Sequence, residues 1–231
     1  MGFNNCNQKH GKHMVFLVVF TMLLPLATRA QATLEIGLQG GSSYYNGDIN
    51  PGKPYVMPQI SYGLLARYNF DDRWSAKFSF THGKIKGDNS VAKVANYDTT
   101  ANFLTTLDDA SITGEFNFMN YATGSKKRSF SPYLMGGIGI FFYNPTVKDI
   151  PADSACQSTN KSDFAVVFGL GFKYSLAKRL GIGIEWSMHK TFTDCLDGIK
   201  NGSNDWYNFT QLSLTYKVDL IKKNTCNTVK W

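Results

Sequence analysis

The chain has 231 residues, of which 43% are hydrophobic and 14% aromatic, and its formal net charge is +7. Without the first thirty residues the charge would fall from +7 to +4, because Lys9, Lys12 and Arg29 lie there. A positive excess of this size gives no basis for a nucleic-acid partner. No segment has the spacing of a phosphate loop, a dinucleotide fingerprint or a zinc site, so we expect no cofactor and no metal.

The first part of the chain has the features of a secretory signal peptide. A basic stretch precedes an apolar run from Met14 to Leu26, which is too short to span a bilayer comfortably, and Ala30 provides a small residue at a cleavage position. An uncleaved anchor helix followed by a soluble domain is the alternative. We predict a signal peptide over 1–30, an outer-membrane β-barrel over 31–219 and a periplasmic tail over 220–231.

Apolar and polar residues alternate with a period of two through the rest of the chain, which indicates β-strands. Between 74 and 80, for example, apolar residues occupy the even positions and polar residues the odd ones. The segment 131–143 does not reveal which of its positions share a face. Each segment is close to the length that a tilted membrane strand needs. The predicted strands are 34–44, 59–69, 73–83, 108–119, 131–143, 163–175, 180–190 and 207–218.

The connections between these strands alternate in length. Short turns alternate with longer polar stretches at 45–58, 84–107, 144–162 and 191–206. This layout is typical of outer-membrane barrels with the long loops outside the cell, and an even strand number places both mature termini in the periplasm. We predict an all-β fold, a small transmembrane antiparallel β-barrel of about eight strands with a filled polar interior. A soluble β-sandwich or lipocalin-like barrel, with the apolar residues inside, is the alternative.

If the apolar residues face lipid, charged residues of both signs lie at the positions that fill the lumen. Isolated charges in a narrow barrel are very costly, so we expect these residues to form pairs across it. We interpret them as a lumen charge network that packs the interior, rather than as an active site. Its predicted members are Glu35, Arg67, Lys77, Glu115, Lys173, Glu185 and Lys217.

A catalytic site at the outer rim is the enzymatic alternative. His189 with Thr191, or His82, lies near the outer end of a predicted strand. An imidazole beside a hydroxyl could support nucleophilic catalysis, provided that a third group orients the imidazole. We interpret these histidines as polar boundary residues, and we predict that the protein is not an enzyme.

In the last predicted loop, Asp194 and Asp197 are the candidates for orienting His189. These two carboxylates together with that of Asp205 are the candidates for binding a divalent cation. Their spacing matches no calcium loop, so we predict solvated loop charges.

Three cysteines follow the predicted signal peptide. On this topology Cys156 and Cys195 fall in the third and fourth outer loops, which are neighbours around the barrel in an oxidising compartment. The topology therefore allows a disulfide between them, and it leaves Cys226 in the tail as a free thiol or as a link to another protein.

Several segments of the chain carry a resemblance to a known family. Residues 40–51, GGSSYYNGDINP, are similar to GGSxYxGDxNP, the start of a family of small outer-membrane barrels, the PorG-like proteins of the type IX secretion system. Residues 190–197, KTFTDCLD, resemble its loop motif RTxTDYLDD. Further similar segments are 68–74, 83–88 and 132–139, so that the resemblance spans nearly the whole mature chain.

The resemblance implies a role in protein export, as a barrel subunit that anchors or contacts a periplasmic ring of PorK and PorN proteins. Cys195 stands where the family usually has tyrosine, and Gly198 where a second aspartate is common. The alternatives are a stand-alone OmpA-like structural or adhesive barrel and a lipid-modifying enzyme at the outer rim. All three functions include contact with outer-membrane lipid. The implied periplasmic partner contacts are Lys126, Lys127, Arg128, Lys222, Lys223 and Trp231.

Overall fold

The structure is a computed structural model of the chain. The predicted signal peptide, 1–30, and the predicted tail, 220–231, lie outside the residues that it describes. The described residues are 32–46, 55, 57–88, 102–148, 156, 162–193, 195–196, 198 and 204–219.

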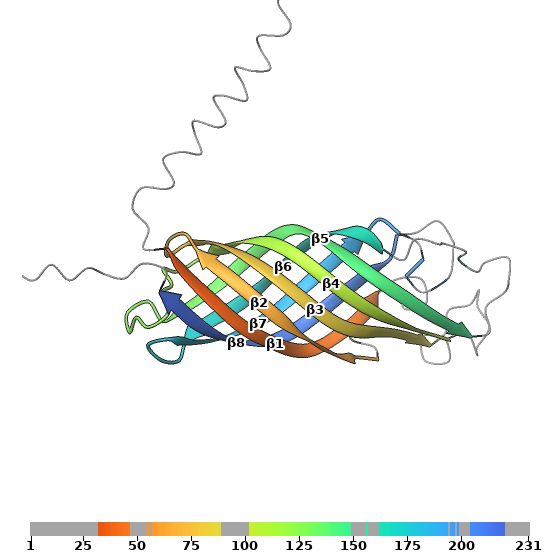
Figure 1. Cartoon of the computed structure of the whole chain (residues 1–231), viewed down its shortest axis with the longest axis horizontal. Coiled ribbons are helices and arrows are strands. Elements are labelled where there is room, and N and C mark those ends of the chain that lie inside the picture. Colours follow the sequence, from red (N-terminus) through yellow and green to blue (C-terminus); the bar gives the residue numbers. More distant parts are fainter. Residues whose placement is uncertain are drawn as a thin grey trace, which may run out of the picture. The chain divides into compact units, whose positions relative to one another are not determined.

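Eight antiparallel strands form a closed barrel in which each strand pairs with the next one along the chain (Figure 1). The barrel is closed by pairing between the first and last strands, from Thr33 opposite Asp219 to Asn46 opposite Trp206. The predicted fold class is therefore confirmed. The strands are β1 (Thr33–Asn46), β2 (Gln59–Asn69), β3 (Trp74–Asp88), β4 (Asn102–Asn117), β5 (Phe130–Lys148), β6 (Ser162–Ser175), β7 (Leu180–Thr191) and β8 (Trp206–Asp219).

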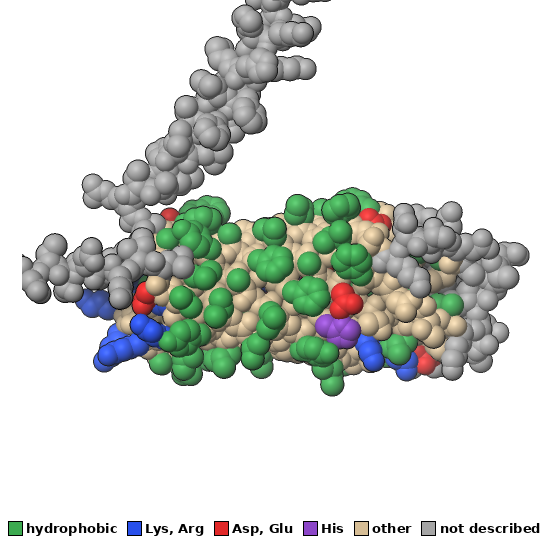
Figure 2. All heavy atoms as spheres, viewed as in Figure 1, with side chains coloured by type: hydrophobic (Ala, Val, Ile, Leu, Met, Phe, Trp, Pro, Cys, Tyr) green, Lys and Arg blue, Asp and Glu red, His purple; other side chains and the backbone are tan. Residues whose placement is uncertain are grey.

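Large apolar side chains on all eight strands face outward. Ile60 is 79% exposed, Ile138 65% and Leu212 65%, and apolar side chains cover much of the barrel surface in Figure 2. Only a lipid environment makes this surface favourable, and a closed barrel satisfies the backbone hydrogen bonds that lipid cannot. The soluble alternative, which needs these residues inside, is wrong. Among the described residues, no helix is long and apolar enough to cross a membrane.

The barrel has two unlike ends. At the turn end, where β1 begins and β8 ends, short connections join β2 to β3, β4 to β5 and β6 to β7. At the opposite end, here called the loop end, β3, β4 and β5 extend by five or six residues beyond the predicted boundaries. The register continues to Asp88 opposite Asn102 and to Asn102 opposite Lys148. The parts of the predicted loops at 84–88, 102–107 and 144–148 are therefore strand.

The inward side chains explain the extension of β3, β4 and β5. Ile85, Phe103, Leu107 and Tyr143 lie at inward positions of these extensions and are all buried in one apolar cluster. In the sequence, the lysines between the inward positions of the β3 extension made this segment resemble a polar loop.

The register of β5, which the sequence left open, is set by its neighbours. Tyr133 and Met135 are buried inside, whereas Leu134 and Ile138 face outward. Odd positions therefore face the lumen. Gly137 lies where a Cβ would be 2.0 Å from the Ile112 carbonyl oxygen, so the glycine allows close approach of β4 and β5.

We predict that an arginine in the middle of the lipid-facing surface destabilises the barrel. Leu38 lies opposite Leu64 and Leu214 and is 62% exposed. Leu38→Arg should lower the free energy of unfolding by about 2–4 kcal/mol, because the guanidinium must enter hydrocarbon. Urea unfolding in lipid vesicles measures this loss. Thr146→Arg, at an exposed position on the β5 extension, is the control and should change little; equal losses in both variants would contradict the assigned lipid face.

Candidate functional site

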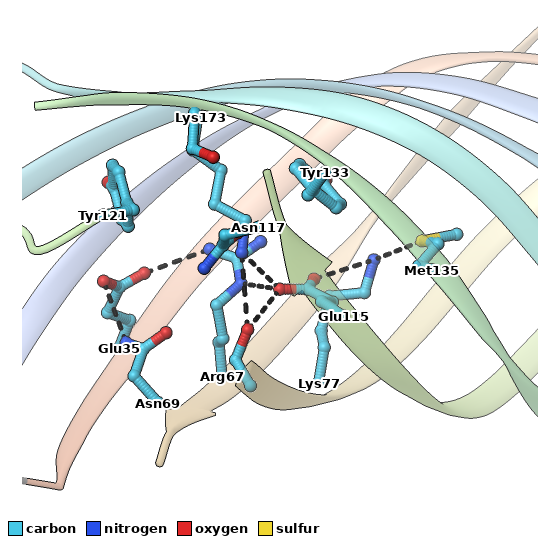
Figure 3. Close-up of polar contacts among 12 residues, drawn as sticks. Glu35, Arg67, Asn69, Lys77, Glu115, Asn117, Tyr121, Tyr133, Met135 and Lys173 are labelled. Carbon is cyan, nitrogen blue, oxygen red and sulfur yellow. Dashed lines mark hydrogen bonds and ion pairs between the residues drawn. The ribbon is translucent and has the colours of Figure 1, made fainter. Parts of the chain in front are cut away.

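The lumen near the turn end holds a compact cluster of ionised side chains (Figure 3). Its members come from six different strands. Side chains alternate between the two faces of a strand, and on each of these strands one member of the cluster lies on the inward face. Five of them are nearly inaccessible, and the sixth, Glu185, is 13% exposed. They are Glu35 on β1, Arg67 on β2, Lys77 on β3, Glu115 on β4, Lys173 on β6 and Glu185 on β7.

Glu115 lies at the centre of this cluster. Its Oε2 is 2.8 Å from Arg67 Nε and also accepts from the Lys173 ammonium, while its Oε1 is 3.9 Å from Lys77 Nζ. Ser75 Oγ donates to the same carboxylate at 2.8 Å. One carboxylate therefore joins three cations that belong to β2, β3 and β6.

The two other carboxylates complete the charge balance on either side of Glu115. Glu35 Oε2 is 3.0 Å from Arg67 Nη1, and Glu185 pairs with Lys77. Tyr133 donates its hydroxyl to Glu185 Oε2 at 2.6 Å. Three anions thus face three cations, and the cluster carries no formal net charge.

Lys217 is the predicted network member that lies outside the cluster. Its side chain is 21% exposed, and its Nζ is 3.7 Å from Asp219 Oδ1 and 3.3 Å from the Thr123 carbonyl oxygen. It is close to the end of β8, where the lumen opens to the turns. Lys217 therefore makes its contacts at the turn end and does not pair with the carboxylates of the charge cluster.

The turn between β4 and β5 closes the lumen below the charge cluster. Tyr121 and Thr123 are buried, and the Thr123 hydroxyl donates to Glu35 Oε1 at 2.5 Å. The sequence showed a short basic turn here and gave no sign that two of its side chains enter the barrel.

A polar layer with little free space lies on the loop-end side of the charge cluster. Its cavity measures about 10 Å³, which is room for about one water molecule. His189 lines this layer and is buried, with its Nδ1 3.2 Å from Asp109 Oδ2 of β4 and its ring stacked on Tyr207. Tyr207 donates to the same carboxylate at 2.7 Å. An aspartate on a strand, Asp109, therefore contacts the histidine.

Among the described residues considered for catalysis, Thr191 and the two histidines have separate partners. Thr191 donates its hydroxyl to the carbonyl oxygens of Thr193 and Asp205, so it is engaged with the loop rather than with His189. The His189 imidazole instead contacts the hydroxyl on its other side along β7, with its Nε2 3.3 Å from Ser187 Oγ. His82 faces outward, with its Nδ1 2.6 Å from Asp108 Oδ1.

The loop end of the lumen is closed by apolar side chains, which the predicted polar interior did not include. Tyr45, Phe103, Phe141, Tyr207 and Phe209 are fully or almost fully buried in one cluster. Leu196, from the loop after β7, inserts into this cluster and is completely buried. The loop thus contributes a plug to the barrel mouth.

Hydrogen bonds hold the inserted loop in place. Asp205 accepts from the backbone N–H of Leu196 at 2.9 Å and from the Tyr45 hydroxyl at 2.7 Å, while Thr105 donates to the Leu196 carbonyl at 2.7 Å. The prediction of a solvated charge is wrong for Asp205, which is buried. Asp194 and Asp197 lie outside the described residues. Across the described part of the chain, no three metal-ligating side chains gather.

The structure joins Cys156 and Cys195 in a disulfide, with their Cα atoms 5.7 Å apart. The Cys156 N–H also donates to the Gly198 carbonyl at 2.9 Å. A Cβ at Gly198 would lie 2.4 Å from Val147 of β5, so the loop packs closely against the extended strand. Cys226 lies outside the described residues.

The predicted partner contacts are only partly within the described chain. Lys126, Lys127 and Arg128 are exposed on the turn between β4 and β5, and Arg128 pairs with Asp72. The other three lie outside the described residues and are Lys222, Lys223 and Trp231.

We predict that Glu115 is the most sensitive position of the lumen. Glu115→Gln should lower the free energy of unfolding by about 3–5 kcal/mol, because it leaves buried cations without their shared anion. Asp219→Asn, which breaks the exposed pair with Arg179, should cost less than about 1 kcal/mol. Urea unfolding of both variants in lipid vesicles measures the two losses in the free energy of unfolding. Losses of similar size would argue against the central role of Glu115.

The disulfide should make a separate contribution to stability. It connects residues 39 apart, so Cys195→Ser should lower the free energy of unfolding by about 4 kcal/mol through the freer unfolded chain. Wild-type protein treated with a reductant is the control and should match the variant. Alkylation of both cysteines in unreduced, unfolded protein, detected by mass spectrometry, would show that the bond is absent.

Comparison with known proteins gives a family and a set of similar folds. A family model described as Domain of unknown function (DUF6089) matches residues 12–228. No curated protein matches the chain. The chain is similar in fold to several solved structures, at low sequence identity. The N-terminal β-barrel domain of Pseudomonas aeruginosa OprF has 10% identity and a TM-score of 0.44, with coverage of 82% of this chain and 98% of that one.

Two further solved structures have a similar extent. Ail of Yersinia pestis has 13% identity and a TM-score of 0.43, with coverage of 81% of this chain and 97% of that one. Neisserial surface protein A has 10% identity and a TM-score of 0.45, with coverage of 82% and 97% respectively. These similarities concern the fold alone.

Proposed function

We propose that this chain, which belongs to the family described as Domain of unknown function (DUF6089), is an outer-membrane barrel subunit of the type IX protein secretion machinery. Its proposed role is to anchor or contact a periplasmic ring of PorK-like and PorN-like proteins. The support is the resemblance of residues 40–51 and 190–197 to the PorG-like motifs, together with the fold of a small outer-membrane β-barrel.

The closed lumen is the observation that carries the proposal of a scaffold. Ion pairs around Glu115, the packed polar layer beside His189 and the apolar plug with Leu196 follow one another along the barrel. A solute path would have to disrupt all three layers. A function in export must therefore be performed by the ends of the barrel, through contacts with other proteins.

The turn end is the end that we assign to the periplasm. Short turns face the periplasm and longer loops face outward in barrels of this class. The described connections at the turn end run over 70–73, 118–129 and 176–179. In this orientation Lys126 and Lys127 face the periplasmic ring, as the resemblance implies.

A stand-alone OmpA-like structural or adhesive barrel is the second candidate. The feature that favours it lies at the loop end, where the disulfide and the buried Leu196 hold the described part of the loop after β7 on the barrel. A lipid-modifying enzyme has less support, because His189 is buried inside the lumen and Thr191 is bonded to its own loop.

Co-purification and secretion separate the first two candidates. We expect the tagged full chain, extracted in mild detergent, to recover a ring-forming lipoprotein with its partner, and we expect a deletion strain to lose exported proteins from its culture medium. Recovery of the barrel alone together with a normal secretome would reject the secretion role. For the enzyme, a lipid A mass spectrum that changes in a His189→Ala strain would support catalysis.

A further inference from the structure

The connections at the turn end pack into one rigid platform, which we define as 70–73, 118–129 and 176–179. Tyr121 N–H donates to the Asp72 carbonyl at 2.9 Å, and Asn117 N–H donates to the Arg73 carbonyl at 2.7 Å. These bonds tie the connection between β2 and β3 to the one between β4 and β5. The buried Tyr121 and Thr123 then anchor the middle of the platform in the lumen.

The third connection of the platform is held by direct backbone contact. Gly124 has a φ of +91°, and a Cβ at this position would lie 2.4 Å from the Lys178 carbonyl oxygen. Its N–H donates to Ser175 Oγ at 2.7 Å. A glycine is therefore required where the turn between β4 and β5 meets the turn between β6 and β7. The backbones of these two turns therefore lie in direct contact.

The acidic groups of the described turn end are already engaged. Asp72 pairs with Arg128, and Asp219 pairs with Arg179. Asp71 Oδ1 accepts hydrogen bonds from the backbone N–H groups of Arg73 and Trp74, each at 2.7 Å. These carboxylates therefore have little capacity left to neutralise other cations.

Four exposed cations on the same platform form no ion pair with any described residue. They occur on all three connections, so that positive charge covers the platform, and Lys and Arg side chains gather at this end in Figure 2. These cations are Arg73, Lys126, Lys127 and Lys178.

The position of these cations favours a protein over lipid as the partner. Lysines and arginines that bind lipid headgroups commonly flank the apolar belt on the outward face. At this end the exposed strand positions next to the turns are instead apolar, at Trp74, Phe130 and Leu180, while Lys126, Lys127 and Lys178 lie within the turns themselves. Exposed cations that form no ion pair with a described residue favour a surface of opposite charge and speed its association.

We propose that the platform is a docking surface for an acidic segment of a partner protein, bound through Lys126, Lys127, Lys178 and Arg73. This inference rests on the proposed function only in taking the turn end as the end that meets a partner. It also changes the contact set that the sequence resemblance implied. Arg128 is neutralised by Asp72, whereas Arg73 and Lys178, from two other connections, join the two lysines.

Binding of a fluorescent oligoglutamate peptide to the full chain in zwitterionic nanodiscs tests the inference. The double variant Lys126→Glu and Lys127→Glu should bind at least about tenfold more weakly than wild type, because like charges then face each other. Lys84→Glu with Lys86→Glu carries the same charge change at the loop end and should bind as wild type does. Salt at about 500 mM should weaken wild-type binding, because it screens exposed charges.

The same two double variants also give the results that would contradict the inference. Equal loss in both double variants, or loss in neither, overturns the platform as the docking surface. Phospholipid content per purified barrel, measured by phosphorus assay, provides the lipid arm. A fall in that content in the turn-end variant overturns the protein partner in favour of headgroup binding, and an unchanged content supports the protein partner.

Failure of this inference is distinguishable from failure of the proposed function. If the platform binds the acidic peptide but the deletion strain secretes normally, only the secretion role is lost. If the turn-end variant still recovers the ring proteins at the wild-type level, the secretion role stands and the acidic docking surface is rejected.

Discussion

Among the described residues, Glu115 is the carboxylate of the lumen that meets three cations, Arg67, Lys77 and Lys173. An eight-stranded barrel has an interior only wide enough for its side chains, so those side chains must neutralise one another. The cations come from β2, β3 and β6, which are not all neighbours around the sheet. Electrostatic pairing therefore ties opposite walls of the barrel together.

The rest of the structure follows from this filled interior. A charged layer, a polar layer and an apolar plug fill the described lumen, so the two ends are the surfaces that we consider for function. The loop end is fixed by Leu196, Asp205 and the disulfide of Cys156 with Cys195. The turn end is fixed by Thr123, whose hydroxyl reaches Glu35 in the charge cluster. Each end is thus built on the packing inside the barrel.

The two ends differ in the character of their packing. At the loop end, β3, β4 and β5 continue past the apolar belt and enclose aromatic side chains, so the mouth is held by apolar burial. At the turn end, hydrogen bonds and backbone contact at Gly124 hold the connections, and the charges remain on the surface. Exposed, fixed charge is suited to recognising a partner, whereas the buried plug is suited to closing the mouth.

The sequence by itself determined the strand number, the two faces of most strands and six members of the charge cluster, because a period of two assigns every residue of a strand to one side. It did not determine which charges meet, since pairing depends on strand register and on closure of β1 with β8. Asp109 and Asp205 were missed as partners of His189 and Tyr45 because they lie far away in the chain. The extensions of β3, β4 and β5, and the insertion of Leu196, depend on apolar contacts between distant segments, which only the tertiary structure decides.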